Sequence, residues 1–107
     1  METRRDIFQA IADPTRRAII ALIAIQAMTP NALAEHFNTS RQAVSKHIKI
    51  LNMAGFITIQ DIGRERHCIL KQDGFNELQK WLEYFDAFWA GKLQKLGALL
   101  NDKKTKK

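Results

Sequence analysis

The sequence predicts a mainly helical domain with one small β-hairpin. Through most of the chain, apolar residues recur at spacings of three and four, as they do in helices with one buried face. Between residues 56 and 70 the pattern changes to two short runs of strand-forming residues around a glycine. A length of 107 residues, 46% of them hydrophobic, suits a single folded domain.

The stretch Met28–Gly55, MTPNALAEHFNTSRQAVSKHIKILNMAG, is the most informative part of the chain. It predicts two short helices joined by a tight polar turn. Thr29 followed by Pro30 is a favourable start for the first helix. Ser40, or Thr39, can cap the second helix by accepting a hydrogen bond from a backbone N–H.

The second of these helices has an outer face of one charge sign. Val44, Ile48 and Leu51 form an apolar stripe that we expect to point inward. No Asp or Glu occurs between residues 36 and 60, and a surface that faces phosphates needs such one-sided charge. The pattern is that of a helix-turn-helix DNA-binding motif, whose second helix lies in the major groove. The alternative is an ordinary amphipathic helix, although solvated faces usually mix both signs.

A hairpin is predicted directly after this helix. Phe56–Gln60 and Arg66–Leu70 are the expected strands, with Gly63 near the tip between them. A hairpin in this place is called a wing, and its arginines, Arg64 and Arg66, can reach phosphates or the minor groove. The alternative, that both are only solvated hairpin charges, has equal weight.

Two further helices are expected ahead of the motif. The first lies in the segment Thr3–Ala12, and Asp13 with Pro14 is a good start for the second, which is apolar almost all round and should be central in the core. Cations in the first turn of a helix are mildly unfavourable. For Arg16 and Arg17 we therefore favour pairing with acids such as Asp13 over contact with phosphate.

Asp73 is the expected cap of a long terminal helix over about 74–100. Its first apolar stripe consists of Phe75, Leu78, Leu82, Phe85, Trp89, Leu93, Leu96 and Leu100, and beside it run Trp81, Tyr84 and Phe88. A small domain cannot readily bury two stripes of one helix, and exposed apolar patches mark interfaces. We expect a homodimer that matches a pseudo-palindromic operator, the alternative being that the aromatic stripe covers the chain's own core. The predicted interface residues are Ile7, Phe8, Ile11, Trp81, Phe85, Phe88, Trp89, Leu93 and Leu96.

Charge and cysteine content limit the function further. Four lysines of the last five residues supply most of the net charge of +6, which leaves +2 for residues 1–102. We predict one domain over residues 1–101 and a disordered basic tail over residues 102–107. The most apolar run, residues 18–27, is too short to cross a bilayer, and a single cysteine excludes an intrachain disulfide. A cytoplasmic protein without a membrane partner fits these features.

Three segments together resemble the ArsR/SmtB family of small winged-helix bacterial repressors: ADPTRRAIIALI, ALAEHFNTSRQAVSKHIKILNMAGFI and GRERHCIL. The similarity covers about residues 7–70, and it is greatest to the autorepressor-like branch that senses no metal. The resemblance implies the order α-α-α-α-β-β-α and a dimer formed through the first and last helices. It also implies operator binding that blocks transcription, with the recognition helix at Ser40–Ala54 and the wing at Ile57–Leu70.

The chain departs from the family's metal sensors. Many of these bind metal through cysteines on the helix that matches Asn31–Phe37, or through groups that include histidines on the last helix, and this chain has neither. Zinc needs three or four converging ligands, whereas His36, His47 and His67 fall on three different elements. We therefore expect no metal and no other cofactor. Cys68 is expected to be a buried strand residue and not a redox switch, because the chain has no second cysteine to resolve a sulfenic acid.

Together these features predict a sequence-specific, double-stranded DNA-binding regulator, a homodimeric repressor of its own or a neighbouring operon. The alternative is a winged-helix protein-interaction module that binds DNA only weakly. An enzyme is not expected, because the sequence contains no convergent nucleophile and base, no glycine-rich phosphate loop and no metal cluster. An inducer is not identified by the sequence. The expected DNA contacts are Thr39, Ser40, Arg41, Gln42, Ser45, Lys46, His47, Lys49, Arg64 and Arg66.

Overall fold

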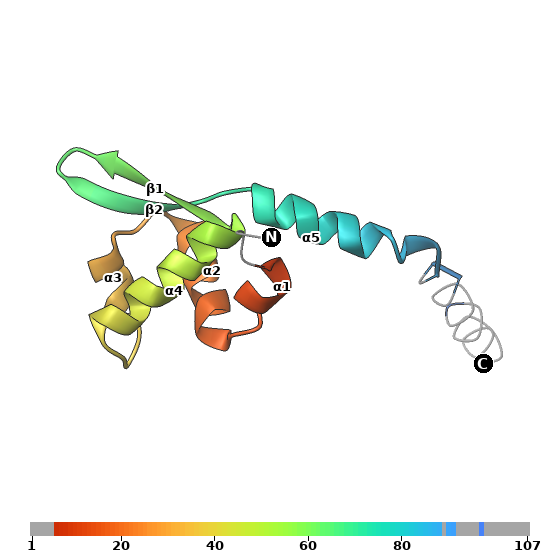
Figure 1. Cartoon of the computed structure of the whole chain (residues 1–107), viewed down its shortest axis with the longest axis horizontal. Coiled ribbons are helices and arrows are strands. Elements are labelled where there is room, and N and C mark those ends of the chain that lie inside the picture. Colours follow the sequence, from red (N-terminus) through yellow and green to blue (C-terminus); the bar gives the residue numbers. More distant parts are fainter. Residues whose placement is uncertain (1–5, 89, 92–96, 98–107) are drawn as a thin grey trace, which may run out of the picture.

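The computed structural model describes residues 6–88, 90–91 and 97. The first four helices of the chain gather at one end of the molecule, and the hairpin and the last helix leave this bundle in opposite directions (Figure 1). The order agrees with the predicted winged helix-turn-helix. The elements are α1 (Ile7–Ala10), α2 (Pro14–Ile25), α3 (Pro30–Ala34), α4 (Arg41–Ala54), β1 (Ile57–Ile62), β2 (Glu65–Leu70) and α5 (Asp73–Glu83).

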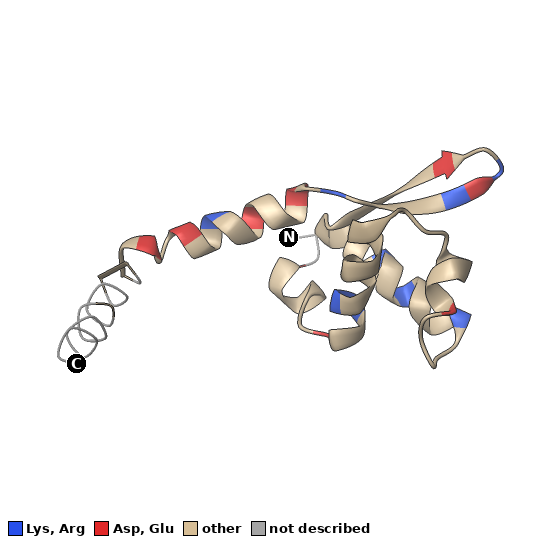
Figure 2. Ribbon diagram, turned by 180° about the vertical axis from the view of Figure 1, so that it is seen from behind, with Lys and Arg blue, Asp and Glu red and all other residues tan. Residues whose placement is uncertain are grey.

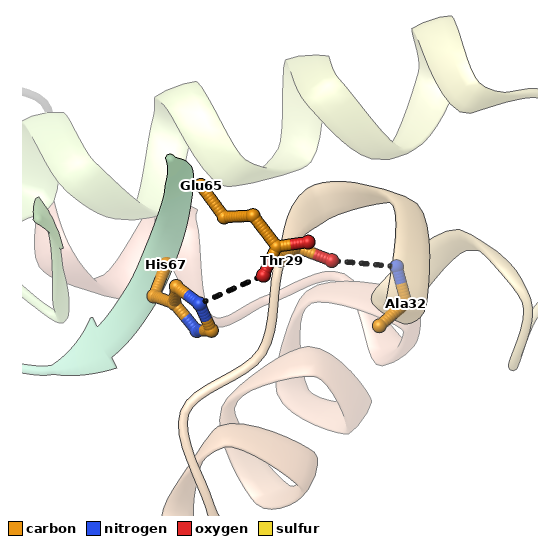
Figure 3. Close-up of polar contacts among 4 residues, drawn as sticks. All are labelled: Thr29, Ala32, Glu65 and His67. Carbon is orange, nitrogen blue, oxygen red and sulfur yellow. Dashed lines mark hydrogen bonds and ion pairs between the residues drawn. The ribbon is translucent and has the colours of Figure 1, made fainter. Parts of the chain in front are cut away.

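Side-chain caps start α2, α3 and α4 where the sequence predicts them. The Asp13 carboxylate accepts a hydrogen bond from the backbone N–H of Arg16 at 3.0 Å, and this bond lowers the pKa of Asp13 below its usual value. Thr29 caps α3 in the same way, through the N–H of residue 32 at 3.1 Å (Figure 3). Of the two candidates for α4, Ser40 is the cap, and its hydroxyl accepts from the N–H of residue 43 at 3.1 Å.

The core lies between the helices of the bundle and the inner ends of the two strands. The predicted stripe of α4 is buried, with Val44 and Leu51 at 0% exposure and Ile48 at 3%. The last residue of α2, Ile25, is 79% exposed, so this helix is less enclosed than its composition suggests. The remaining members of the core are Ile7, Ala10, Ile19, Ile23, Leu33, Ala54, Phe56, Ile57 and Cys68.

The hairpin is antiparallel, and its tip turns at Gly63, which has a φ of 65°. Its register runs from Ile57 opposite Leu70 to Ile62 opposite Glu65. Two further backbone bonds attach β2 to the residue before the cap of α3: the N–H of Cys68 donates to the carbonyl of Met28 at 2.7 Å, and the reverse bond measures 3.3 Å. The hairpin is therefore anchored at its base, while its tip extends beyond the helices (Figure 1).

Two predictions for the terminal helix were wrong. Gln72 precedes α5 without a side-chain cap, and Asp73 lies inside the helix, where its carboxylate pairs with Lys71 at 3.5 Å. The helix is also not continuous: α5 ends at Glu83, because the N–H of Phe85 bonds three residues back, to Leu82, at 3.0 Å, and this forms a turn at residues 84–85. Residues 86–88 and 90–91 are helical again.

None of the described helices is both long enough and apolar enough to cross a membrane.

Candidate nucleic-acid interface

The outward face of α4 is polar and cationic. Its side chains are exposed as predicted, and α4 itself carries no acidic residue. In Figure 2 the lysines and arginines of the bundle lie on the helices as isolated blue segments, while most acidic residues lie on α5 and the hairpin. The arrangement leaves a positive, hydrogen-bonding surface on one side of the helix. Its exposed members are Thr39 and Ser40 at the start, then Arg41, Gln42, Ser45, Lys46 and Lys49.

A hollow continues this surface from α4 toward the wing. Arg41 and Ser45 of α4 line one side and Arg66 of β2 lines another, with the start of α3 between them. Glu65 also lines the hollow, and its carboxylate lies 3.4 Å from Nε2 of His67 (Figure 3). The bundle thus brings the predicted helix contacts and one wing arginine to a common surface.

The wing itself has mixed charge, unlike α4. Arg66 lies opposite Asp61 in the register, and its Nε is 3.7 Å from a carboxylate oxygen of that residue. Both side chains are largely exposed, at 71% and 82%, so the pair contributes little to stability. Arg64 follows the tip glycine and is exposed. The two wing arginines therefore have different surroundings, because Arg66 has an acidic neighbour that a phosphate would have to replace.

The arginines of α2 do not pair with the Asp13 carboxylate through their side chains. Arg16 and Arg17 turn back to the end of α1, where the guanidinium of Arg17 donates to the carbonyls of Ile11 at 2.8 Å and Ala12 at 3.1 Å. These carbonyls directly follow the last residue of α1, where no further turn of helix supplies a donor, and Arg17 supplies one. This set of contacts was not predicted, because residue types alone do not reveal which carbonyls are free.

His47 lies at the flank of α4 and is half-buried. Its Nδ1 is 3.3 Å from Nη1 of Arg16, so the ring already has a partner inside the protein. His47 therefore differs from the other predicted contacts on α4, whose side chains are exposed.

The described residues contain no group of three or more His, Cys, Asp or Glu side chains that could hold a metal ion. His36 is exposed on the segment after α3, and His67 lies in the wing beside Glu65. Cys68 is wholly buried, and this burial raises the pKa of its thiol. The prediction of a buried strand cysteine is confirmed.

Aromatic side chains form an exposed surface where α1 meets α5. The rings of Phe8 and Trp81 pack edge to face at 5.0 Å between centroids, and Trp81 packs on Phe85 at the same distance. Trp81 is 49% exposed and Phe88 is 54% exposed, while Ile11 is half-buried.

Ile7 is a correction to the predicted interface. It points into the core and is only 4% exposed, because α1 presents one side to the bundle and Phe8 lies on the other. Three other predicted interface residues lie outside the described part of the chain: Trp89, Leu93 and Leu96.

Comparisons with known proteins agree with this architecture. A family of helix-turn-helix domains matches residues 11–60. The transcriptional repressor SdpR of Bacillus subtilis (strain 168) is 35% identical over 80 residues, which are 75% of this chain and 89% of the repressor. The HTH-type transcriptional regulator Rv2034 of Mycobacterium tuberculosis is 34% identical over 94 residues, 88% of this chain and 85% of the regulator. A crystal structure of an ArsR family transcriptional regulator matches this chain with a TM-score of 0.71 and 34% identity. The match covers 78% of this chain and 87% of the chain in that structure.

Proposed function

This chain belongs to the ArsR family of winged helix-turn-helix, DNA-binding transcriptional regulators, and from that premise we propose that it is a homodimeric repressor of its own or a neighbouring operon. Repression would follow from occupation of operator DNA, as the name of the relative SdpR suggests. Such a protein acts in the bacterial cytoplasm. The family is one of regulators and not of enzymes, and no catalytic step enters the proposal.

The outward face of α4 is the observation that carries the proposal. An α-helix fits the major groove of B-DNA, where base edges present distinct patterns of donors and acceptors. Gln42 can bond adenine with both ends of its amide, and Ser45 and Lys46 lie one turn further along the same face. Arg41 and Lys49 would bind phosphates on either side. The remaining proposed contacts are Thr39, Ser40 and His47 of the helix and Arg64 and Arg66 of the wing.

The exposed aromatic surface supports a dimer. Phe8, Trp81 and Phe88 leave a large part of their rings in water, and exposed apolar patches of this kind mark interfaces with other proteins. A two-fold axis between the α1 and α5 helices of two copies would present two α4 helices to one face of DNA. Their separation would have to match half-sites of about 34–36 Å, one turn of B-DNA. The proposed interface also includes Ile11, Phe85, Trp89, Leu93 and Leu96.

The first test is fluorescence anisotropy of the protein on the DNA upstream of its own coding region, with a scrambled duplex of equal length for comparison. Salt should be near physiological concentration, because low salt inflates non-specific binding. We expect a preference of about a hundredfold or more for the upstream DNA, within the range of specific over non-specific binding. Equal and weak binding to both duplexes would contradict repression of its own operon.

A charge reversal separates the proposed repressor from a protein-interaction module. Lys46→Glu places an acid on the recognition face and should abolish DNA binding while the sedimentation of the protein stays unchanged. Lys80→Glu makes the same charge change on the polar side of α5, where Lys80 lines a hollow with Asn76 and Glu83, and serves as the control. If both variants bind DNA as the wild type does, α4 is not the DNA-binding face.

A further inference from the structure

Arg16 links three parts of the bundle through one side chain. Its Nε donates to the carbonyl of Ala10 at 2.6 Å, and its Nη2 donates to the carbonyl of Gln9 at 2.9 Å. The remaining nitrogen, Nη1, lies 3.3 Å from Nδ1 of His47. A residue at the start of α2 therefore bonds the end of α1 on one side and the flank of α4 on the other.

The chemistry of the contact fixes the state of the histidine ring. A guanidinium has only donors, so Nδ1 of His47 must offer its lone pair to Arg16. The ring then carries its hydrogen on Nε2. This assignment is a direct consequence of the contact, and it can be measured independently of DNA.

The link matters because of what α1 carries. This helix has only four residues, too few to hold an orientation by its own hydrogen bonds. On its outer side Phe8 packs against Trp81 of α5, at the centre of the exposed aromatic surface. The orientation of α1 thus sets how the aromatic surface lies relative to α4.

We propose that Arg16 is a positioning residue for operator binding. Through His47, it holds α1 and its aromatic surface at a fixed angle to the recognition helix, α4. The inference rests on the proposed dimeric binding of DNA. In a dimer formed through α1 and α5, the angle between α1 and α4 determines the distance between the two recognition helices. Loss of the link would therefore weaken binding to two half-sites at fixed spacing more than binding to one half-site.

Direct contact of Arg16 with a phosphate gives a different expectation. Loss of a phosphate contact weakens binding to every sequence alike and reduces the salt dependence by about one counterion. If Arg16 acted only as a cap of α1, the Arg17 variant should lose as much binding as the Arg16 variant, because Arg17 bonds the same end of α1 without reaching α4. Arg17 is therefore the matched control for Arg16.

The experiment compares Arg16→Lys with Arg17→Lys. Lysine keeps the charge, but its three donors lie on one nitrogen and cannot span acceptors as widely spaced as those bonded by Nε, Nη1 and Nη2 of Arg16. The wild type first selects its preferred duplexes from a random DNA library. Both variants are then titrated by anisotropy against such a duplex with two half-sites and against a shortened duplex with one half-site. We expect Arg16→Lys to bind the two-half-site duplex about tenfold more weakly, the effect of losing a hydrogen bond to a charged group, and the single half-site within about twofold of wild type. Arg17→Lys should stay within about twofold on both.

His47→Ala removes the link from its other end. Because His47 is also a proposed DNA contact, this variant should weaken binding to both duplexes, and binding to the two-half-site duplex more strongly. Combined with Arg16→Lys it should not increase this difference further. Equal losses on one and two half-sites, or equal behaviour of the Arg16 and Arg17 variants, would overturn the inference. Failure of the wild type to enrich any duplex would instead refute the proposed function.

The ¹⁵N spectrum of the free protein tests the link between Arg16 and His47 by itself, even in that case or where a variant does not fold. In the wild type the His47 ring should carry its hydrogen on Nε2 while Nδ1 accepts from Arg16. The Nδ1 resonance should shift in Arg16→Lys, where this hydrogen bond is lost, and not in Arg17→Lys. A ring with its hydrogen on Nδ1 in the wild type excludes the link, whatever the DNA measurements show.

Discussion

Gly74→Ala is expected to destabilise the fold, although alanine is the better helix former. Gly74 lies in the first turn of α5, where the chain leaves the bundle, and it is buried. A Cβ atom built on it would lie 2.8, 2.9 and 3.0 Å from three ring carbons of Phe56. Phe56 is wholly buried, and its ring packs edge to face on Phe75 at 4.9 Å, so it has little room to withdraw.

The size of the effect follows from these distances. Non-bonded carbons prefer separations of about 3.5–4.0 Å, so the ring or α5 would have to move by roughly 0.7 Å. Forcing an extra carbon into a packed core costs about 1–3 kcal/mol. The gain in helix propensity is at most about 1 kcal/mol, and less in the first turn than in a helix interior. The net expectation is a loss of about 1–2 kcal/mol in the free energy of unfolding.

The measurement is urea unfolding followed by circular dichroism, at one protein concentration because the stability of a dimer depends on it. Gly91→Ala is the control, since a Cβ at Gly91 meets nothing within 4 Å in a helical stretch, and it should leave the stability unchanged or slightly raise it. A Gly74→Ala variant as stable as the wild type would show that Phe56 or α5 yields easily. The reasoning that the approach of Phe56 leaves no room for a side chain at Gly74 would then be refuted.

Three other outcomes are expected. Gln42→Ala should relax the preference for one base by about 1–3 kcal/mol in a competition assay, whereas an equal loss on all sequences would place Gln42 on phosphate. Trp81→Ala removes the ring between Phe8 and Phe85 and should weaken self-association by about tenfold or more in analytical ultracentrifugation; an unchanged constant would remove Trp81 from the interface. The buried Cys68 thiol, whose pKa is raised, should resist a thiol reagent until the protein is unfolded, and rapid reaction in the native state would contradict its burial.

Much of the DNA-binding motif could be predicted because its signals are local. The caps Asp13, Thr29 and Ser40 act on backbone N–H groups three residues away, so each is visible in a few letters of sequence. The spacing of Val44, Ile48 and Leu51 decides which side of α4 is buried, and therefore which side is free for DNA.

The terminal helix was predicted less well, because its structure depends on competing contacts. Asp73 is a good cap by type, yet its carboxylate pairs with Lys71 and the helix begins one residue earlier. The apolar stripe predicted an unbroken terminal helix, but periodicity does not detect the bond from Phe85 to Leu82 that closes a turn.

By itself the sequence determined the order of the elements, the inward and outward faces of α4 and the one-sided charge of its outer face, because each follows from spacing and residue type within one element. Only the tertiary structure decided that Ile7 belongs to the core and Phe8 to the surface, and that Arg16 reaches both α1 and His47. His47 lies 31 residues from Arg16 in the chain. Such a contact depends on how two helices cross, and no periodicity within either helix specifies that geometry.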